Sequence, residues 1–204
     1  MEKRLIPTPR SLDDIKIRSR DLIGRGWGKL ERFVFRHRRF DGEWSDEITR
    51  DLYTIGEVSM ILPYDPAHDA VLLVEQFRTC GLYWNEATWL FEAIAGIIDP
   101  GETPPEVAQR EAGEEANIDI AKPVPIATVY SSPGGYGERT HMYAGRADLS
   151  AAGGLHGLAH EHEDIRAVVV PLDEAYAACF DGRIRDAKTI LMIQWLTTNK
   201  SQLV

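Results

Sequence analysis

Three glutamates are concentrated in the short run Arg110-Glu111-Ala112-Gly113-Glu114-Glu115. Their spacing of i, i+3 and i+4 places them on one face of an α-helix. Like charges at such spacings repel one another by about 0.2–0.5 kcal/mol per pair, so a positive charge is needed nearby. Hard divalent cations such as Mg²⁺ prefer carboxylate oxygens, and the run therefore suits a metal site. The alternative is an acidic helix face exposed to solvent.

The helix that must position these glutamates is marked at both ends. Thr103 is a good N-cap, Pro104 suits the first helical position, and Glu106 completes a capping box. At the other end, Asn117 tolerates the left-handed conformation that closes many helices. The sequence therefore predicts a helix over residues 104–116.

The segment that leads into this helix favours the metal site over the exposed acidic face. It reads Gly96-Ile97-Ile98-Asp99-Pro100-Gly101-Glu102, which supplies glycines where the backbone must turn tightly. It also supplies a fourth carboxylate, Glu102, at a fixed distance before the helix.

Together these residues resemble the box of the Nudix hydrolases. One position departs from the family pattern, because Asn117 stands where the family has glycine. Asparagine is the next best residue for a left-handed backbone, so the departure matters little. The residues that match the box in register are Gly96, Glu102, Arg110, Glu111, Ala112, Glu114, Glu115 and Ile118.

The resemblance implies an α+β fold, a Nudix α/β/α sandwich with a mixed β-sheet, in a catalytic domain over residues 57–204. The residue pattern agrees, since predicted strands and helices interleave without regular βα alternation. The expected strands span residues 58–62, 71–76, 90–95, 124–130, 141–147 and 165–170, and the further helices span residues 173–180 and 186–198.

Residues 1–56 are expected to form an N-terminal antiparallel β arm. Alternating residues over 33–40 and 44–53 flank Asp41-Gly42, which is a strong hairpin signal. A lone hairpin is marginally stable in water, so it needs a partner surface on the main domain or on another copy of the chain. The family resemblance implies a homodimer in which these arms are exchanged.

Features outside the box are similar to the ADP-ribose pyrophosphatase branch of the family. Ser132-Pro133-Gly134-Gly135 places a proline 15 residues beyond Ile118, a spacing that marks this branch. The resemblance implies hydrolysis of ADP-ribose to AMP and ribose 5-phosphate with Mg²⁺, for which Mn²⁺ could substitute. Two alternatives are a hydrolase of another nucleotide sugar such as GDP-mannose, and a non-catalytic sensor or regulator that binds ADP-ribose.

The resemblance also implies roles for individual residues. Glu161 is the favoured general base, with Glu163 second, in a segment that closes over the substrate. Trp27 of the partner's arm would stack on the adenine, Arg50 and Arg78 would contact the diphosphate or the terminal ribose, and Glu138 would lie near that ribose. The metal would be held by Glu111, Glu114, Glu115 and the backbone carbonyl of Ala95, or a neighbouring carbonyl.

Length and composition limit the other possibilities. A chain of 204 residues and 22.9 kDa suits one domain plus extra chain. The net charge of −9 opposes binding to a nucleic acid polymer. No apolar stretch approaches the ~20 residues that cross a bilayer, and no secretory signal is visible, so we expect a cytoplasmic protein that does not span a membrane. The two cysteines, Cys80 and Cys179, are expected to be buried thiols.

Overall fold

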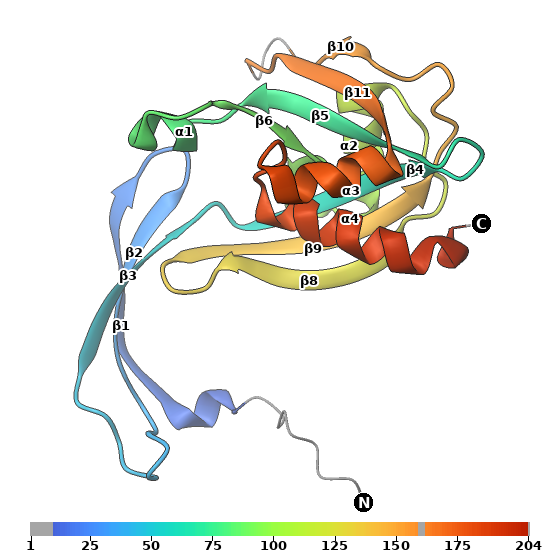
Figure 1. The fold of residues 1–204 in the computed structure, drawn as a ribbon. Coiled ribbons are helices and arrows are strands. Elements are labelled where there is room, and N and C mark those ends of the chain that lie inside the picture. Colours follow the sequence, from blue (N-terminus) through green and yellow to red (C-terminus); the bar gives the residue numbers. More distant parts are fainter. Residues whose placement is uncertain (1–9, 159–161, 204) are drawn as a thin grey trace, which may run out of the picture. The chain divides into compact units, whose positions relative to one another are not determined.

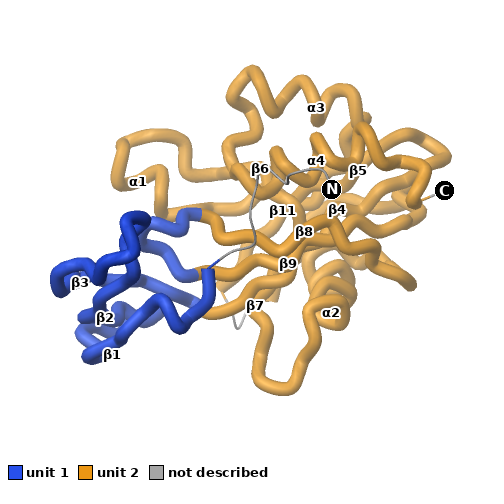
Figure 2. The backbone as a smooth tube through the Cα atoms, turned by 90° about the horizontal axis from the view of Figure 1, so that it is seen from below, with its two compact units in different colours: residues 1–55, 132–137 blue, residues 56–131, 138–204 orange. Residues whose placement is uncertain are grey.

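The computed structural model of the chain describes residues 10–158 and 162–203. The chain divides into two compact units (Figure 2). The first unit comprises residues 1–55 and 132–137, and the second comprises residues 56–131 and 138–204. In the described part of the chain, no helix is long and apolar enough to cross a membrane.

The first unit is built on an antiparallel sheet of three strands with β2 in the middle (Figure 1). The predicted hairpin is confirmed: it is formed by β2 and β3, and Gly42 lies in their connection with a φ of +90°. A third strand, β1, was not predicted because nearly all of its side chains are exposed and show no apolar alternation. The strands are β1 (Ile15–Arg25), β2 (Lys29–His37) and β3 (Ile48–Thr54).

Residues 132–137, which connect two later strands, also belong to the first unit. The Tyr53 N–H donates to the Gly135 carbonyl at 3.0 Å, and Thr54 Oγ1 donates to the Gly137 carbonyl at 3.2 Å. The rings of Tyr53 and Tyr136 stack with their centroids 5.9 Å apart. The Ser-Pro-Gly-Gly turn is therefore tied to strand β3.

The second unit contains a mixed β-sheet. Strands β4 and β9 pair in parallel. The pairings of β4 with β5 and β7, of β5 with β6 and β11, and of β10 with β11 are antiparallel. Strands β4 and β5 pair only near their connecting turn, and beyond it β4 pairs with β7 while β5 pairs with β6. The strands are β4 (Glu57–Asp65), β5 (Ala70–Phe77), β6 (Trp89–Glu92), β7 (Ile94–Ile97), β8 (Val124–Ser132), β9 (Tyr136–Arg146), β10 (Gly154–His156) and β11 (Ile165–Pro171).

Helices cover both faces of this sheet, as the α/β/α prediction requires. Helix α2 (Pro104–Ala116) lies on one face, and α3 (Leu172–Asp181) and α4 (Ala187–Asn199) lie on the other (Figures 1 and 2). The bounds of α2 are those predicted. Its apolar face joins one buried cluster with strands β4 and β5, made by Ala108, Ala112, Ala116, Ile61, Leu72 and Val74 among others.

Some local expectations were wrong. The strand expected over residues 90–95 is two short strands, because the Ala93 N–H donates to Thr189 Oγ1 of α4 at 2.8 Å instead of to another strand. Helix α1 (Cys80–Trp84) and strand β10 were not predicted. Cys80, at the start of α1, is exposed and Cys179 is half-buried, so neither is the fully buried thiol expected.

Candidate active site

Helix α2 has the ends that its sequence predicts. The Glu106 carboxylate accepts the Thr103 N–H at 2.9 Å, and the capping box between these residues is complete. Asn117 closes the helix with a φ of +51°. Contacts between residues close in sequence fix both ends of α2. The helical geometry of this segment therefore decides on which face the glutamates project.

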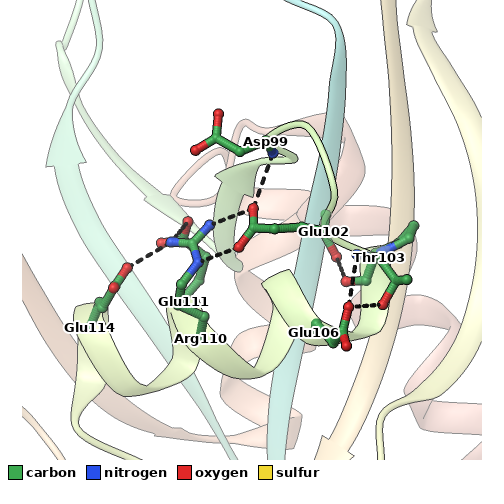
Figure 3. A network of polar contacts seen from close by, with 9 residues as sticks. Asp99, Glu102, Thr103, Glu106, Arg110, Glu111 and Glu114 are labelled. Atoms are coloured by element: carbon green, nitrogen blue, oxygen red, sulfur yellow. Dashed lines mark hydrogen bonds and ion pairs between the residues drawn. The ribbon is translucent and has the colours of Figure 1, made fainter.

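Arg110 gathers three carboxylates at one guanidinium (Figure 3). Its Nε donates to Glu102 Oε1 at 3.0 Å, and its Nη1 donates to Glu111 Oε1 and Glu114 Oε2, both at 2.8 Å. The Asp99 N–H donates to the second oxygen of Glu102 at 3.0 Å. This arrangement compensates part of the repulsion among the acidic side chains.

Glu115 lies outside the Arg110 network. It is 2% exposed, and its Oε2 has no hydrogen-bond partner among the described residues. Burial raises the pKa of Glu115 well above its usual range, the charges of Glu111 and Glu163 raise it further, and Arg78 and a hydrogen bond from the Ala95 backbone oppose them. A buried carboxylate oxygen without a partner is costly unless a ligand satisfies it.

Glu111 lies directly against the backbone of strand β7. A Cβ built on Gly96 would come within 1.7 Å of Glu111 Oε1, so only glycine fits at position 96 with the glutamate in this place. Burial raises the pKa of Glu111 to about 7, against the opposing effect of Arg110. The glycine that opens the box therefore makes room for a box carboxylate.

These residues have the donor chemistry of a site for a hard divalent cation. Such an ion would give the buried oxygen of Glu115 a partner. It would also stabilise the charged form of Glu111, which burial disfavours. In residues 10–158 and 162–203, no three His, Cys, Asp or Glu side chains are already grouped as metal ligands. Two of the expected metal ligands, Glu111 and Glu114, are hydrogen-bonded to Arg110, so an ion at this place would compete with Arg110 for them.

Arg78 is the predicted substrate residue that the structure brings to this helix. Its positive charge acts on the pKa of Glu115, so the two side chains are within electrostatic reach of each other. Its Nε and Nη2 both donate to Glu92 Oε2, at 2.9 and 2.7 Å. The guanidinium is thus anchored on the side of Glu92.

Glu138 is 5% exposed and accepts hydrogen bonds inside the second unit. Ser131 Oγ donates to its Oε1 at 2.7 Å, Thr140 Oγ1 donates to the same oxygen at 2.8 Å, and Lys188 Nζ lies 3.7 Å away. Its predicted role near the terminal ribose stays a prediction.

The two predicted substrate residues of the arm lie in the first unit. Trp27 is 77% exposed in the turn between β1 and β2. Arg50, on β3, is exposed and its Nη1 donates to the carbonyl of Thr49 at 2.7 Å. An exposed aromatic ring and an exposed guanidinium are both available to bind a ligand or a second chain.

Of the two candidates for the general base, Glu163 lies in the described part of the chain and Glu161, the favoured base, does not. Glu163 accepts the Leu158 N–H at 3.2 Å, and its charge raises the pKa of both Glu111 and Glu115. Glu163 is therefore close to the acidic helix.

A partly buried polar cluster next to Arg78 was missed at the level of sequence. It joins Glu92, at the end of β6, to Asp186 and Lys188, at the start of α4. Lys188 Nζ lies 3.2 Å from Asp186 Oδ1, and its charge also interacts with Glu92. No local pattern marks these residues, because they come together only when α4 packs on the sheet.

Similarity to known proteins supports the identification of a Nudix box in this chain. A family model described as the NUDIX domain matches residues 55–192. The chain is 38% identical over 198 residues to an ADP-ribose pyrophosphatase of Escherichia coli (strain K12), covering 97% of this chain and 95% of that protein. It is 40% identical over 196 residues to the enzyme of the same name from Haemophilus influenzae, covering 95% of this chain and 90% of that protein.

Two further relatives bear on substrate and fold. A GDP-mannose pyrophosphatase of Pectobacterium atrosepticum is 36% identical over 185 residues, covering 88% of this chain and 92% of that protein. A crystal structure of an ADP compounds hydrolase has the same fold, with a TM-score of 0.70 at 18% identity over 95% of this chain and 98% of that one. The box glutamates on α2, the matching domain and the near full-length relatives together show that this chain belongs to the Nudix family.

Proposed function

We propose that the protein is a hydrolase that cleaves the pyrophosphate bond of ADP-ribose to give AMP and ribose 5-phosphate. The observation that carries this proposal is the buried, partnerless oxygen of Glu115 beside Glu111 on an intact Nudix helix. The near full-length similarity to proteins named ADP-ribose pyrophosphatase supports the choice of substrate.

Hydrolases of this type depend on a divalent metal, and we assign Mg²⁺, with Mn²⁺ as a substitute. Glu111, Glu114, Glu115 and the backbone carbonyl of Ala95 would hold it. When bound, the metal neutralises diphosphate charge and lowers the pKa of a coordinated water.

The remaining steps fall to the protein's own side chains. The base, Glu161 or alternatively Glu163, accepts the proton of the attacking water as the water oxygen bonds to one phosphorus. The bridging P–O bond of the pyrophosphate breaks, and the other phosphate leaves with the bridging oxygen. Arg78 and Arg50 bind diphosphate oxygens, for which the planar fork of arginine is suited. Trp27 stacks on the adenine and Glu138 lies near the terminal ribose.

The arm's role in this proposal is to complete a homodimer by exchange. Residues 1–55 carry 13 Lys and Arg against 10 Asp and Glu, whereas the whole chain has a net charge of −9. The arm is therefore net positive and the rest of the chain strongly negative. Opposite charge favours docking of the arm of one chain on the catalytic unit of another.

A hydrolase of GDP-mannose is the second candidate, because a relative at 36% identity carries that name. The non-catalytic sensor is disfavoured because the box glutamates are all present. A panel of ADP-ribose, GDP-mannose, ADP-glucose and diadenosine compounds with Mg²⁺, with products identified, separates the three. We expect the highest kcat/KM for ADP-ribose; a higher value for GDP-mannose, or binding without turnover, would refute the proposal.

The Glu115→Gln variant tests the metal assignment within the same experiment. It should lose at least ~100-fold in kcat, because a ligand that stabilises the reacting charge is removed. Its thermal unfolding temperature should not fall, because the neutral amide replaces a carboxylate whose charge is disfavoured by burial. Full activity of this variant with Mg²⁺ would exclude Glu115 as a metal ligand.

A further inference from the structure

Glu92 holds Arg78 by one edge of its guanidinium. Both Nε and Nη2 donate to the same oxygen, Glu92 Oε2, at 2.9 and 2.7 Å. The Glu92 side chain is 11% exposed and that of Arg78 is 38% exposed, so the pair is partly removed from water. Charge-assisted hydrogen bonds in such surroundings fix the plane of a guanidinium more firmly than a surface pair does.

The opposite edge of the same guanidinium has no hydrogen-bond partner at Nη1 among the described residues. A guanidinium that is anchored through Nε and Nη2 presents Nη1 and the second Nη2 proton to a ligand. That edge suits two oxygens of a diphosphate.

Without Glu92, Arg78 has a competing partner. Glu115 is within electrostatic reach of Arg78 and has a buried oxygen with no partner among the described residues. A released guanidinium would be attracted to that carboxylate and turned away from the substrate side. By holding Nε and Nη2, Glu92 opposes this movement.

Residues behind Glu92 fix its own position. Thr189 Oγ1 accepts the N–H of Ala93, the residue after Glu92, at 2.8 Å. The same hydroxyl donates to Asp186 Oδ2 at 2.8 Å, and Lys188, 3.2 Å from Asp186, adds a positive charge near Glu92. Strand β6 thus ends against the start of α4. These contacts hold the backbone at Glu92 in place.

We propose that Glu92 is a positioning residue that orients the free edge of Arg78 toward the diphosphate of the substrate and keeps Arg78 away from Glu115. This inference rests on the proposed function, because it assumes a diphosphate substrate at the acidic helix. It assigns a role to a residue that is neither one of the proposed metal ligands nor one of the proposed substrate contacts.

The test is a double-mutant cycle in the full-length protein. Glu92→Gln keeps the shape of the side chain and removes its charge. We expect KM for ADP-ribose to rise about tenfold with kcat within about twofold of wild type, because ground-state orientation is lost. In an Arg78→Met background, Glu92→Gln should change KM by less than about twofold, since its partner is already absent.

Glu75→Gln is the matched control. Glu75, on β5, accepts Arg166 Nε at 2.7 Å in a cross-strand pair that does not include Arg78. This variant should leave KM unchanged. Equal KM values for Glu92→Gln and wild type, or a tenfold rise that persists in the Arg78→Met background, would overturn the proposal.

Two measurements keep the result independent of folding and of turnover. Should Glu92→Gln not fold, Glu92→Asp shortens the carboxylate and should raise KM by a smaller factor; an unchanged KM in that variant refutes the proposal. Calorimetric titration with ADP in EDTA measures diphosphate binding without hydrolysis, and Glu92→Gln should weaken it. Failure of the proposed function would show as no turnover by the wild type, whereas equal ADP affinity of variant and wild type would overturn this inference alone.

Discussion

Gly96 and Glu111 occupy space that only one side chain can fill, because a Cβ at position 96 would lie 1.7 Å from Glu111 Oε1. The first glycine of the box, Gly96, thus leaves the space that the Glu111 carboxylate occupies. Gly113, within α2, has nothing within 4 Å of a Cβ built on it and is therefore a natural control.

Gly96→Ala should displace Glu111 and reduce kcat by at least ~100-fold, since a ligand of the reacting site is moved. Gly113→Ala should keep its activity and raise the free energy of unfolding by about 0.5–1 kcal/mol, because alanine is the better helix former. Steady-state kinetics and urea unfolding measure both effects. Normal turnover by Gly96→Ala would show that Glu111 need not lie where the structure places it.

Arg110→Met should destabilise the protein in EDTA by about 1–3 kcal/mol, because three carboxylates lose their common hydrogen-bond donor. Excess Mg²⁺ should recover part of that loss by supplying another positive charge. Urea unfolding in EDTA and in Mg²⁺ measures the difference.

Arg183→Met is the control for Arg110. Arg183 bonds Asp181 and Glu174 on the surface, so its loss should cost at most about 1 kcal/mol and should not depend on Mg²⁺. Equal stability of Arg110→Met and wild type in EDTA would contradict the prediction.

Asp65 is a buried carboxylate at the end of β4, just before the turn to β5. Its pKa is lowered to about 2, mainly by His68, whose Nδ1 lies 2.7 Å from Oδ2, while burial opposes the shift and the N–H groups of Leu149 and Ala67 add to it. A carboxylate whose pKa falls on folding stabilises the fold above its unfolded pKa of 3.8. That contribution disappears as the pH falls through about 2.

Asp65→Asn should therefore lose about 2 kcal/mol of unfolding free energy at pH 7, and the gap to wild type should shrink between pH ~4 and ~2. Urea unfolding at several pH values across this range measures the gap. The same pairing raises the pKa of His68. The stability that protonated His68 contributes is therefore present at low pH and is lost as the pH rises through the pKa of His68 in the folded protein. A constant gap from pH 7 to pH 2.5 would refute the assigned pKa.

Exchange of arms predicts complementation between a variant of the arm and a variant of the acidic helix. Trp27→Ala removes the arm's aromatic residue and Glu115→Gln removes a metal ligand. If the arm of one chain serves the site of the other, a mixed dimer contains one site in which both residues are intact. After unfolding and refolding together, the mixture should exceed the summed activity of the separate variants.

Sedimentation of the wild type provides the control for this experiment and should give twice the 22.9 kDa chain mass. Refolding each variant alone controls for activity gained by refolding itself. A monomer in solution, or a mixture no more active than its components, would exclude the exchanged arm.

The amino-acid sequence by itself determined the helix that carries the chemistry. Thr103, Glu106 and Asn117 fix the ends of α2 through contacts with residues three to five positions away. The spacing of the glutamates then fixes the face on which they project. The hairpin of β2 and β3 was predictable for the same reason, since its turn residues lie between its strands.

Only the tertiary structure decided what surrounds that helix. The pair of Arg78 and Glu92 joins residues 14 positions apart, and the bond from Ala93 to Thr189 spans 96 positions. Neither pairing is encoded in a local pattern, because each partner is chosen by how β5, β6 and α4 meet in space. Gly96 likewise carries a turn signal in sequence, while its close contact with Glu111 exists only after α2 has packed against β7.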